Sequence, residues 1–149
     1  MKNRLFPLVL LLINISYGQM ISLGPFTLLE SMESARAKCI SLKHSESFGS
    51  LEQYVADDGG KFPFQLMFSG NQVYSISMIA DNSSYVDYER AVKDFTKTLG
   101  RYPDNKYGPN DVLPWYGSVW WWYDQVTFDI TFVPKMSRVI LNLKPRYEN

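Results

Sequence analysis

Two stretches of the chain space their apolar residues as amphipathic helices do. In the first, apolar residues from Leu28 to Cys39 follow one another at steps of four, three and four, opposite a polar face. Thr27 and Glu30 have the spacing of a capping box, in which two side chains satisfy backbone N–H groups of the first turn. The pattern therefore predicts a helix that begins at Thr27.

The second stretch has the stronger helical period. Its apolar stripe recurs at i, i+3, i+4, i+7 and i+11 and consists of Tyr88, Ala91, Val92, Phe95 and Leu99. Ser84 and Asp87 again have capping-box spacing, and Gly100 suits the left-handed backbone that ends many helices. We expect a helix that begins after Ser84 and ends at Gly100.

Three strands are predicted after each helix, mostly from alternating apolar and polar positions. Their ranges are 51–55, 62–68, 74–80, 119–123, 126–133 and 138–143. Segment 44–50 is mostly polar, and segment 101–118 contains three prolines and two glycines without a usable period, so both are predicted as loops.

These elements predict a single α+β domain with a mainly antiparallel sheet and two helices on one face. The expected element order is helix, three strands, helix, three strands. The two halves match in element order and hardly at all in residue identity. We expect the loop 101–118 to cover part of the other face of the sheet.

The N-terminal segment has the features of a secretory signal peptide. Lys2 and Arg4 are followed by an apolar run to Ile15, and small residues stand before a cleavage site at Gln19. The run is about ten residues long, whereas a bilayer-spanning helix needs about 20. The sequence thus predicts a signal peptide at 1–18, a single domain at 19–149 to which that segment is loosely attached, and a secreted or periplasmic protein. A permanent membrane anchor is the alternative interpretation.

Composition limits the possible partners and the source of stability. The 15 basic and 15 acidic residues balance and are scattered, which argues against nucleic acid as a partner. Cys39 is the single cysteine, so no intrachain disulfide forms and the core must stabilise the fold alone. Asn82 begins a glycosylation sequon, which acts as an acceptor only in a eukaryotic source and is otherwise a turn.

Several turn and cap residues carry a resemblance to a known type of protein. They are Gly24 to Thr27 with Glu30, the segment Phe68 to Ile76, and Tyr107-Gly108-Pro109. In these the chain resembles small secreted bacterial α+β domains, namely the beta-lactamase inhibitor protein and the outer-membrane assembly lipoproteins of similar fold. It lacks the disulfides of the former and the lipidated cysteine of the latter. The resemblance implies a non-enzymatic binding role and transfers no site residue.

The sequence contains no recognisable catalytic or metal-binding motif. His44 is the single histidine, which excludes a zinc site built on two or three histidines, and the sequence suggests no partner that would orient it as a base. Hydrolase and nucleotide-binding motifs are also absent. We therefore predict no catalytic residue, no metal site and no cofactor.

Six large aromatic residues lie close together at 115–116 and 120–123. Successive strand residues point to opposite faces, so Trp120 and Trp122 cannot share a face with Trp121 and Tyr123. One pair must therefore leave the core face, and either the loop 101–118 covers that opposite face in a small second core, or the face presents its aromatic rings to a partner or a sugar. We favour the covered arrangement, because an exposed pair is a liability without a ligand. The binding hypothesis names Trp115, Tyr116, Trp121 and Tyr123 as its residues.

The leading functional prediction is a secreted or periplasmic non-enzymatic binding protein, inhibitor-like or immunity-like, that uses the aromatic strand and the adjacent loop to bind a protein partner. The alternative is a carbohydrate-binding or carbohydrate-active protein, with Trp115, Trp121 and Tyr123 stacking on sugar and Asp124 or Asp129 as an acid. Asp124 also fits a hairpin turn, and Asp129 an outward strand position. The partner and the oligomeric state are left open.

Overall fold

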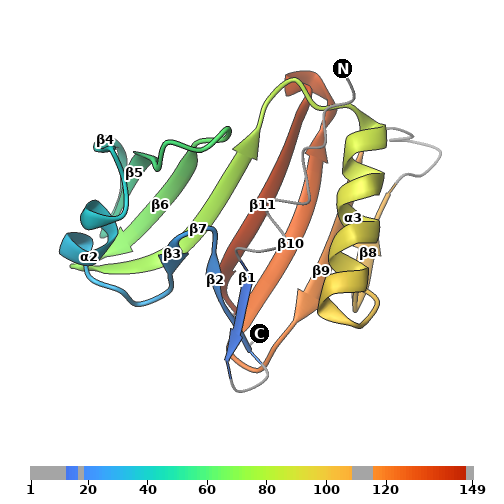
Figure 1. Ribbon diagram of the computed structural model, residues 1–149, viewed down its shortest axis with the longest axis horizontal. Helices are drawn as coiled ribbons and strands as arrows, with labels where there is room; N and C mark the ends of the chain where they lie inside the picture. The colour runs from blue at the N-terminus through green and yellow to red at the C-terminus, as the bar shows by residue number, and fades with distance from the viewer. Residues whose placement is uncertain (1–12, 17–18, 109–115, 147–149) are drawn as a thin grey trace.

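The computed structural model describes residues 13–16, 19–108 and 116–146 (Figure 1). Its main feature is an eight-stranded antiparallel sheet with the order β4-β5-β6-β7-β11-β10-β9-β8. The strands are β4 Ser41–Phe48, β5 Leu51–Asp57, β6 Phe64–Ser69, β7 Gln72–Ala80, β8 Asn105–Tyr107, β9 Gly117–Trp122, β10 Val126–Val133 and β11 Arg138–Pro145. A 3₁₀ turn, Pro134–Met136, joins β10 to β11. The predicted antiparallel sheet is confirmed.

The longer helix, α3 (Tyr85–Leu99), forms as the sequence predicts. The Ser84 hydroxyl accepts a hydrogen bond from the Asp87 backbone N–H, and the Asp87 carboxylate accepts one from the Ser84 N–H. Gly100 ends the helix with φ at 69°. Tyr88, Ala91 and Phe95 are buried toward the sheet, and α3 contacts β9 and β10.

The first helix is shorter than predicted and begins later. α2 spans Met32–Ala37 with Ser31 as its cap, and Thr27 lies in the two-residue strand β3 (Phe26–Thr27). The Thr27–Glu30 contact does form, since the Glu30 carboxylate accepts a hydrogen bond from the Thr27 N–H at 2.7 Å. This contact stabilises a turn and not the start of a helix. Leu29 has a positive φ of 67°, which a right-handed helix does not allow, and its N–H donates to the Val73 carbonyl. The helix start predicted at Thr27 was wrong.

Two predicted loops contain strands. Segment 44–50 is mostly part of β4, whose side chains from Lys43 to Phe48 are exposed, so no apolar period marks it. Segment 101–118 contributes β8, which pairs with β9 at the edge of the sheet. The order is therefore a helix followed by four strands, twice, with β7 paired to β11 where the halves meet.

A second small sheet lies over the middle of the large one, between α2 and α3 (Figure 1). It consists of β1 (Ile13–Ser16), β2 (Gln19–Leu23) and β3, and β2 contacts β7, β10 and β11. Leu23 and Phe26 are fully buried. β1 belongs to the segment predicted to be loosely attached, yet it pairs antiparallel with β2, with one shift of register between Asn14 and Ile15.

The hydrophobic core lies between the large sheet and the elements on its helix side. Its largest fully buried side chains are Trp121, Phe26, Phe68, Phe95 and Phe128. The other side of the sheet, here called the outer face, carries the alternate residues of the same strands, among them Trp120, Trp122, Thr127, Asp129, Asn142 and Lys144. Among the described residues, no helix combines the length and apolar character that crossing a membrane would require.

Candidate functional site

Two of the aromatic residues proposed for binding belong to the helix side of the sheet. Trp121 has no exposed surface; its ring stacks on Phe128 at 5.5 Å between centroids, and its Nε1 donates to the Arg101 carbonyl at 3.2 Å. Tyr123 is half-buried against the core, with the Arg101 guanidinium 4.7 Å from its ring centroid. Burial raises the pKa of the Tyr123 hydroxyl. Trp121 therefore has no surface with which to touch a ligand.

The other two proposed residues lie differently. Tyr116 is half-buried, and its ring meets Tyr107 edge to face at 5.8 Å between centroids. Trp115 lies outside the described residues.

The outer face of β8 and β9 carries a group of accessible aromatic rings. Trp122 is 39% exposed, Tyr107 is 48% exposed, and Trp120 is partly exposed. Tyr107 pairs with Ser118 and Asn105 with Trp120, so β8 extends the same face to the sheet edge. We call Tyr107, Tyr116, Trp120 and Trp122 the outer aromatic surface.

The pairing of β9 with β10, which follows from the position of the hairpin turn in the sequence, assigns each tryptophan to the correct face of the sheet. With Asp124-Gln125 as the turn, Trp121 lies opposite Phe128 and Trp122 opposite Thr127. In β10 the apolar face contains Phe128 and the polar face contains Thr127 and Asp129. Cross-strand partners share a face, so the composition of β10 assigns Trp121 to the core and Trp122 to the outside.

Next to the aromatic surface, a hydrogen-bonded polar row crosses the outer face. The Ser77 hydroxyl donates to Asn142 Oδ1 at 2.6 Å, and Asn142 Nδ2 donates to Asp129 Oδ1 at 2.8 Å. The Thr131 hydroxyl lies 3.2 Å from the same carboxylate oxygen and 2.6 Å from the Ser118 hydroxyl. The polar row thus joins β7, β11, β10 and β9 through side chains.

Asp129 is the unusual member of this row. The sequence placed it facing outward, and it does, but its side chain is only 3% exposed. Its Oδ2 receives no hydrogen bond from any residue the structure describes, and the nearest charge is the Lys144 ammonium at 3.3 Å. The ion pair with Lys144 offsets the burial of this oxygen, and the atom keeps capacity to accept a hydrogen bond of better geometry.

Asp124 and Asp129 do not form a glycosidase pair. Asp124 is exposed in the turn after β9, whereas Asp129 lies inside β10. The strand from Val126 to Asp129 alone covers about 10 Å. The two carboxyls of a glycosidase stand roughly 5–9.5 Å apart.

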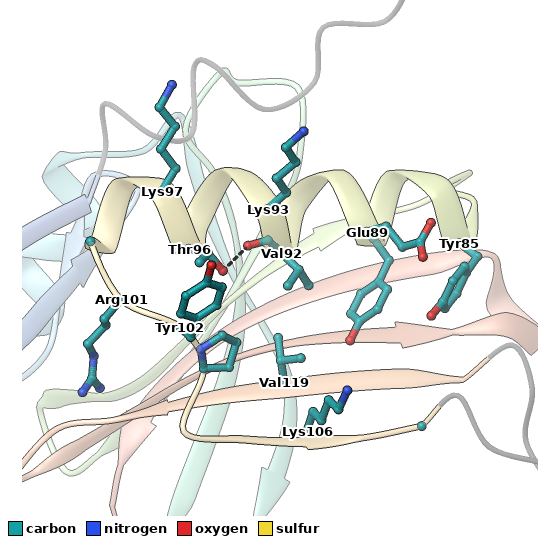
Figure 2. Close-up of a pocket in the computed structure, with 14 residues that line it drawn as sticks. Tyr85, Glu89, Val92, Lys93, Thr96, Lys97, Arg101, Tyr102, Lys106 and Val119 are labelled. Carbon is teal, nitrogen blue, oxygen red and sulfur yellow. Dashed lines mark hydrogen bonds between the residues drawn. The ribbon is translucent and has the colours of Figure 1, made fainter.

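A groove of about 790 Å³ lies on the helix side, between α3 and β8 (Figure 2). Val92 and Thr96 point from α3 toward the sheet, and Tyr102, which is 84% exposed, lies below them. Lys93 and Lys97 point away from the sheet in Figure 2, so their charges do not lie inside the groove. The Thr96 hydroxyl is bonded to the Val92 carbonyl at 2.7 Å.

His44 belongs to β4 and contacts Ser47 and Glu52. The same ring nitrogen, Nε2, lies 2.6 Å from Glu52 Oε2 and 3.2 Å from the Ser47 hydroxyl. The Ser47 hydroxyl itself donates to Glu52 at 2.6 Å. A Ser–His–acid triad instead uses the two ring nitrogens for the two partners, so this cluster lacks the geometry of a triad. Among the described residues, no group of three or more His, Cys, Asp or Glu side chains is arranged to hold a metal ion.

Comparison of the chain with protein-family models, with curated proteins and with solved structures finds no match. The fold and the outer aromatic surface therefore define the class: an α+β protein with an open antiparallel sheet, one face of which carries the core and the other accessible rings beside a polar row.

Proposed function

We propose that this chain is a non-enzymatic binding protein that contacts its partner through the outer aromatic surface. The observation that supports this is the exposure of Trp122 and Tyr107 on one open sheet face, with Trp120 and Tyr116 beside them. Large exposed rings that gather on one face mark interaction sites, because such a patch is unfavourable in water without a partner.

The place of action in this proposal is outside the cytoplasm. It rests on the signal-peptide pattern of Met1 to Gly18. An inhibitor-like or immunity-like role is the form that the resemblance to small secreted α+β domains suggests, and in such a role binding alone is sufficient.

The test compares what the protein captures with and without the outer rings. Immobilised protein is exposed to the extracellular or envelope fraction of its source, and the double variant Trp122→Ala/Tyr107→Ala is compared with native protein. Tyr102→Ala is the matched control, because Tyr102 is 84% exposed but lines the groove on the helix side.

We expect the double variant to lose the captured component and Tyr102→Ala to retain it. Equal capture by all three proteins would refute the proposal. Loss only in Tyr102→Ala would assign binding to the groove instead.

A further inference from the structure

We propose that the ligand of the outer aromatic surface is a neutral saccharide, held between its indole rings and the polar row. This inference rests on the proposed function, since it assumes that the outer face is the binding face. The structure favours a sugar over other ligands for three reasons: the alignment of rings with polar groups, a carboxylate oxygen paired only with an exposed lysine, and a balanced charge.

The first reason is the register of β9 against β10. Trp120 lies opposite Asp129, and Trp122 lies opposite Thr127, so each indole has a polar cross-strand neighbour. Such neighbours have Cβ atoms about 4.5–5.5 Å apart. A pyranose has an apolar C–H face that packs on an aromatic ring and a rim of hydroxyl groups. A sugar unit on an indole therefore places its hydroxyls beside the polar neighbour, and because Thr127 and Asp129 are only 7% and 2% exposed, covering side chains must shift for a hydroxyl to reach them.

The second reason is the hydrogen-bonding capacity of the row. Asp129 Oδ2 is buried, and among the described residues its partner is the Lys144 ammonium at 3.3 Å, an ion pair without hydrogen-bond geometry. Lys144 lies over it, but the lysine side chain is 43% exposed and flexible, so it can move aside when a hydroxyl arrives. A sugar hydroxyl would then donate to Asp129 and accept from Lys144, and its own donor and acceptor would both be satisfied.

The third reason is charge. Asp129 and Lys144 neutralise each other at 3.3 Å, so the polar part of the site presents no net charge. A phosphate-bearing ligand would need several unpaired cations, and among the described residues the other cation in contact with these rings is Arg146, whose guanidinium lies 5.4 Å from the Trp122 ring centroid. An uncharged ligand rich in hydroxyls fits best.

The experiment titrates the full chain with tetrasaccharides of β-1,4-linked glucose, β-1,4-linked N-acetylglucosamine, β-1,4-linked xylose and β-1,4-linked mannose, using calorimetry. Native protein is compared with Trp122→Ala, Thr127→Val and the control Tyr102→Ala. Thr127→Val keeps the shape and β-propensity of the side chain and removes only the hydroxyl opposite Trp122.

We expect at least one tetrasaccharide to bind. Trp122→Ala should weaken it by about tenfold or more, as loss of a central aromatic contact does. Thr127→Val should weaken it by about two- to tenfold, the effect of one hydrogen bond. Tyr102→Ala should leave the affinity unchanged, and circular dichroism confirms that each variant is folded.

Two results would overturn the inference. If no tetrasaccharide binds while Trp122→Ala/Tyr107→Ala still abolishes capture, the ligand is a protein, and the proposed function survives without the sugar. If a tetrasaccharide binds native protein and Trp122→Ala equally, the sugar site lies elsewhere in the molecule.

Discussion

Replacing each of two adjacent tryptophans by alanine tests the assignment of the two sheet faces. Trp121 and Trp122 are neighbours in β9, yet the first is fully buried and the second is 39% exposed. If the faces are assigned correctly, Trp121→Ala removes core packing, and Trp122→Ala removes only surface contacts.

The structure gives the size of the difference. Trp121 stacks on Phe128 and donates its Nε1 hydrogen to the Arg101 carbonyl, so truncation leaves a large cavity and an acceptor without this donor. Such a change lowers the free energy of unfolding by about 3–5 kcal/mol. Trp122→Ala removes a contact with the Arg146 guanidinium worth about 0.5–1 kcal/mol at an exposed position, together with the packing of the covered part of a ring that is already 39% exposed, so its loss should be smaller than that of Trp121→Ala.

Urea denaturation measures both free energies, and acrylamide quenching of tryptophan fluorescence reports which ring is accessible. Trp122→Ala should remove much of the quenchable emission, whereas Trp121→Phe should not. Trp121→Phe also serves as the packing control, because it keeps a ring against Phe128 and should be less destabilising than Trp121→Ala. Equal losses of stability in Trp121→Ala and Trp122→Ala, or unchanged quenching in Trp122→Ala, would show that the two faces are assigned wrongly.

Three further predictions concern local structure. Ser84→Ala removes the acceptor for the Asp87 N–H and should lower the free energy of unfolding by about 1 kcal/mol in a urea titration; no change would mean that α3 does not depend on this cap. Gly117→Ala would place a Cβ 2.5 Å from the Tyr88 ring and should cost about 1–3 kcal/mol by the same measurement; a neutral result would contradict this close approach. The pKa of Glu52 is lowered, chiefly by the Ser47 hydroxyl and then by His44, so the midpoint of its NMR titration should lie below the ordinary 4.5. Ser47→Ala should raise that midpoint. Because this pKa is lower in the folded state, its small contribution to stability is present above about pH 4.5 and disappears as the pH falls through the folded pKa.

The sequence was most informative where local chemistry and burial agree. Strand β10 occupies 126–133 as predicted, because alternate apolar residues, from Val126 to Phe132, face the core and short turns bound it. Helix α3 has its predicted cap and stop because Ser84, Asp87 and Gly100 each satisfy a terminal backbone group or a positive φ. The polar strand β4 was not predicted, because its exposed side chains show no alternation of apolar and polar residues and it is stabilised by pairing with β5.

The candidate site was harder to predict, because strand alternation divides the residues between two faces without showing which face is buried. The sequence correctly divided Trp120 and Trp122 from Trp121 and Tyr123, but the core face depends on packing against α3 and on the partner strand. The polar row was also missed, since Ser77 and Asn142 are 65 residues apart and their contact requires β7 to pair with β11.

The pairing of β7 with β11 also affects the order in which parts of the chain fold. Within the described part of the chain, the other strand pairs of the large sheet join strands that follow one another in sequence. Contacts of this local kind form quickly, whereas closing a distant pair carries a larger entropic penalty and slows folding. We therefore expect each helix with its four strands to organise first and the central seam to close last. The Ser77–Asn142 hydrogen bond of the polar row crosses that seam, so neither half alone can assemble the complete polar row.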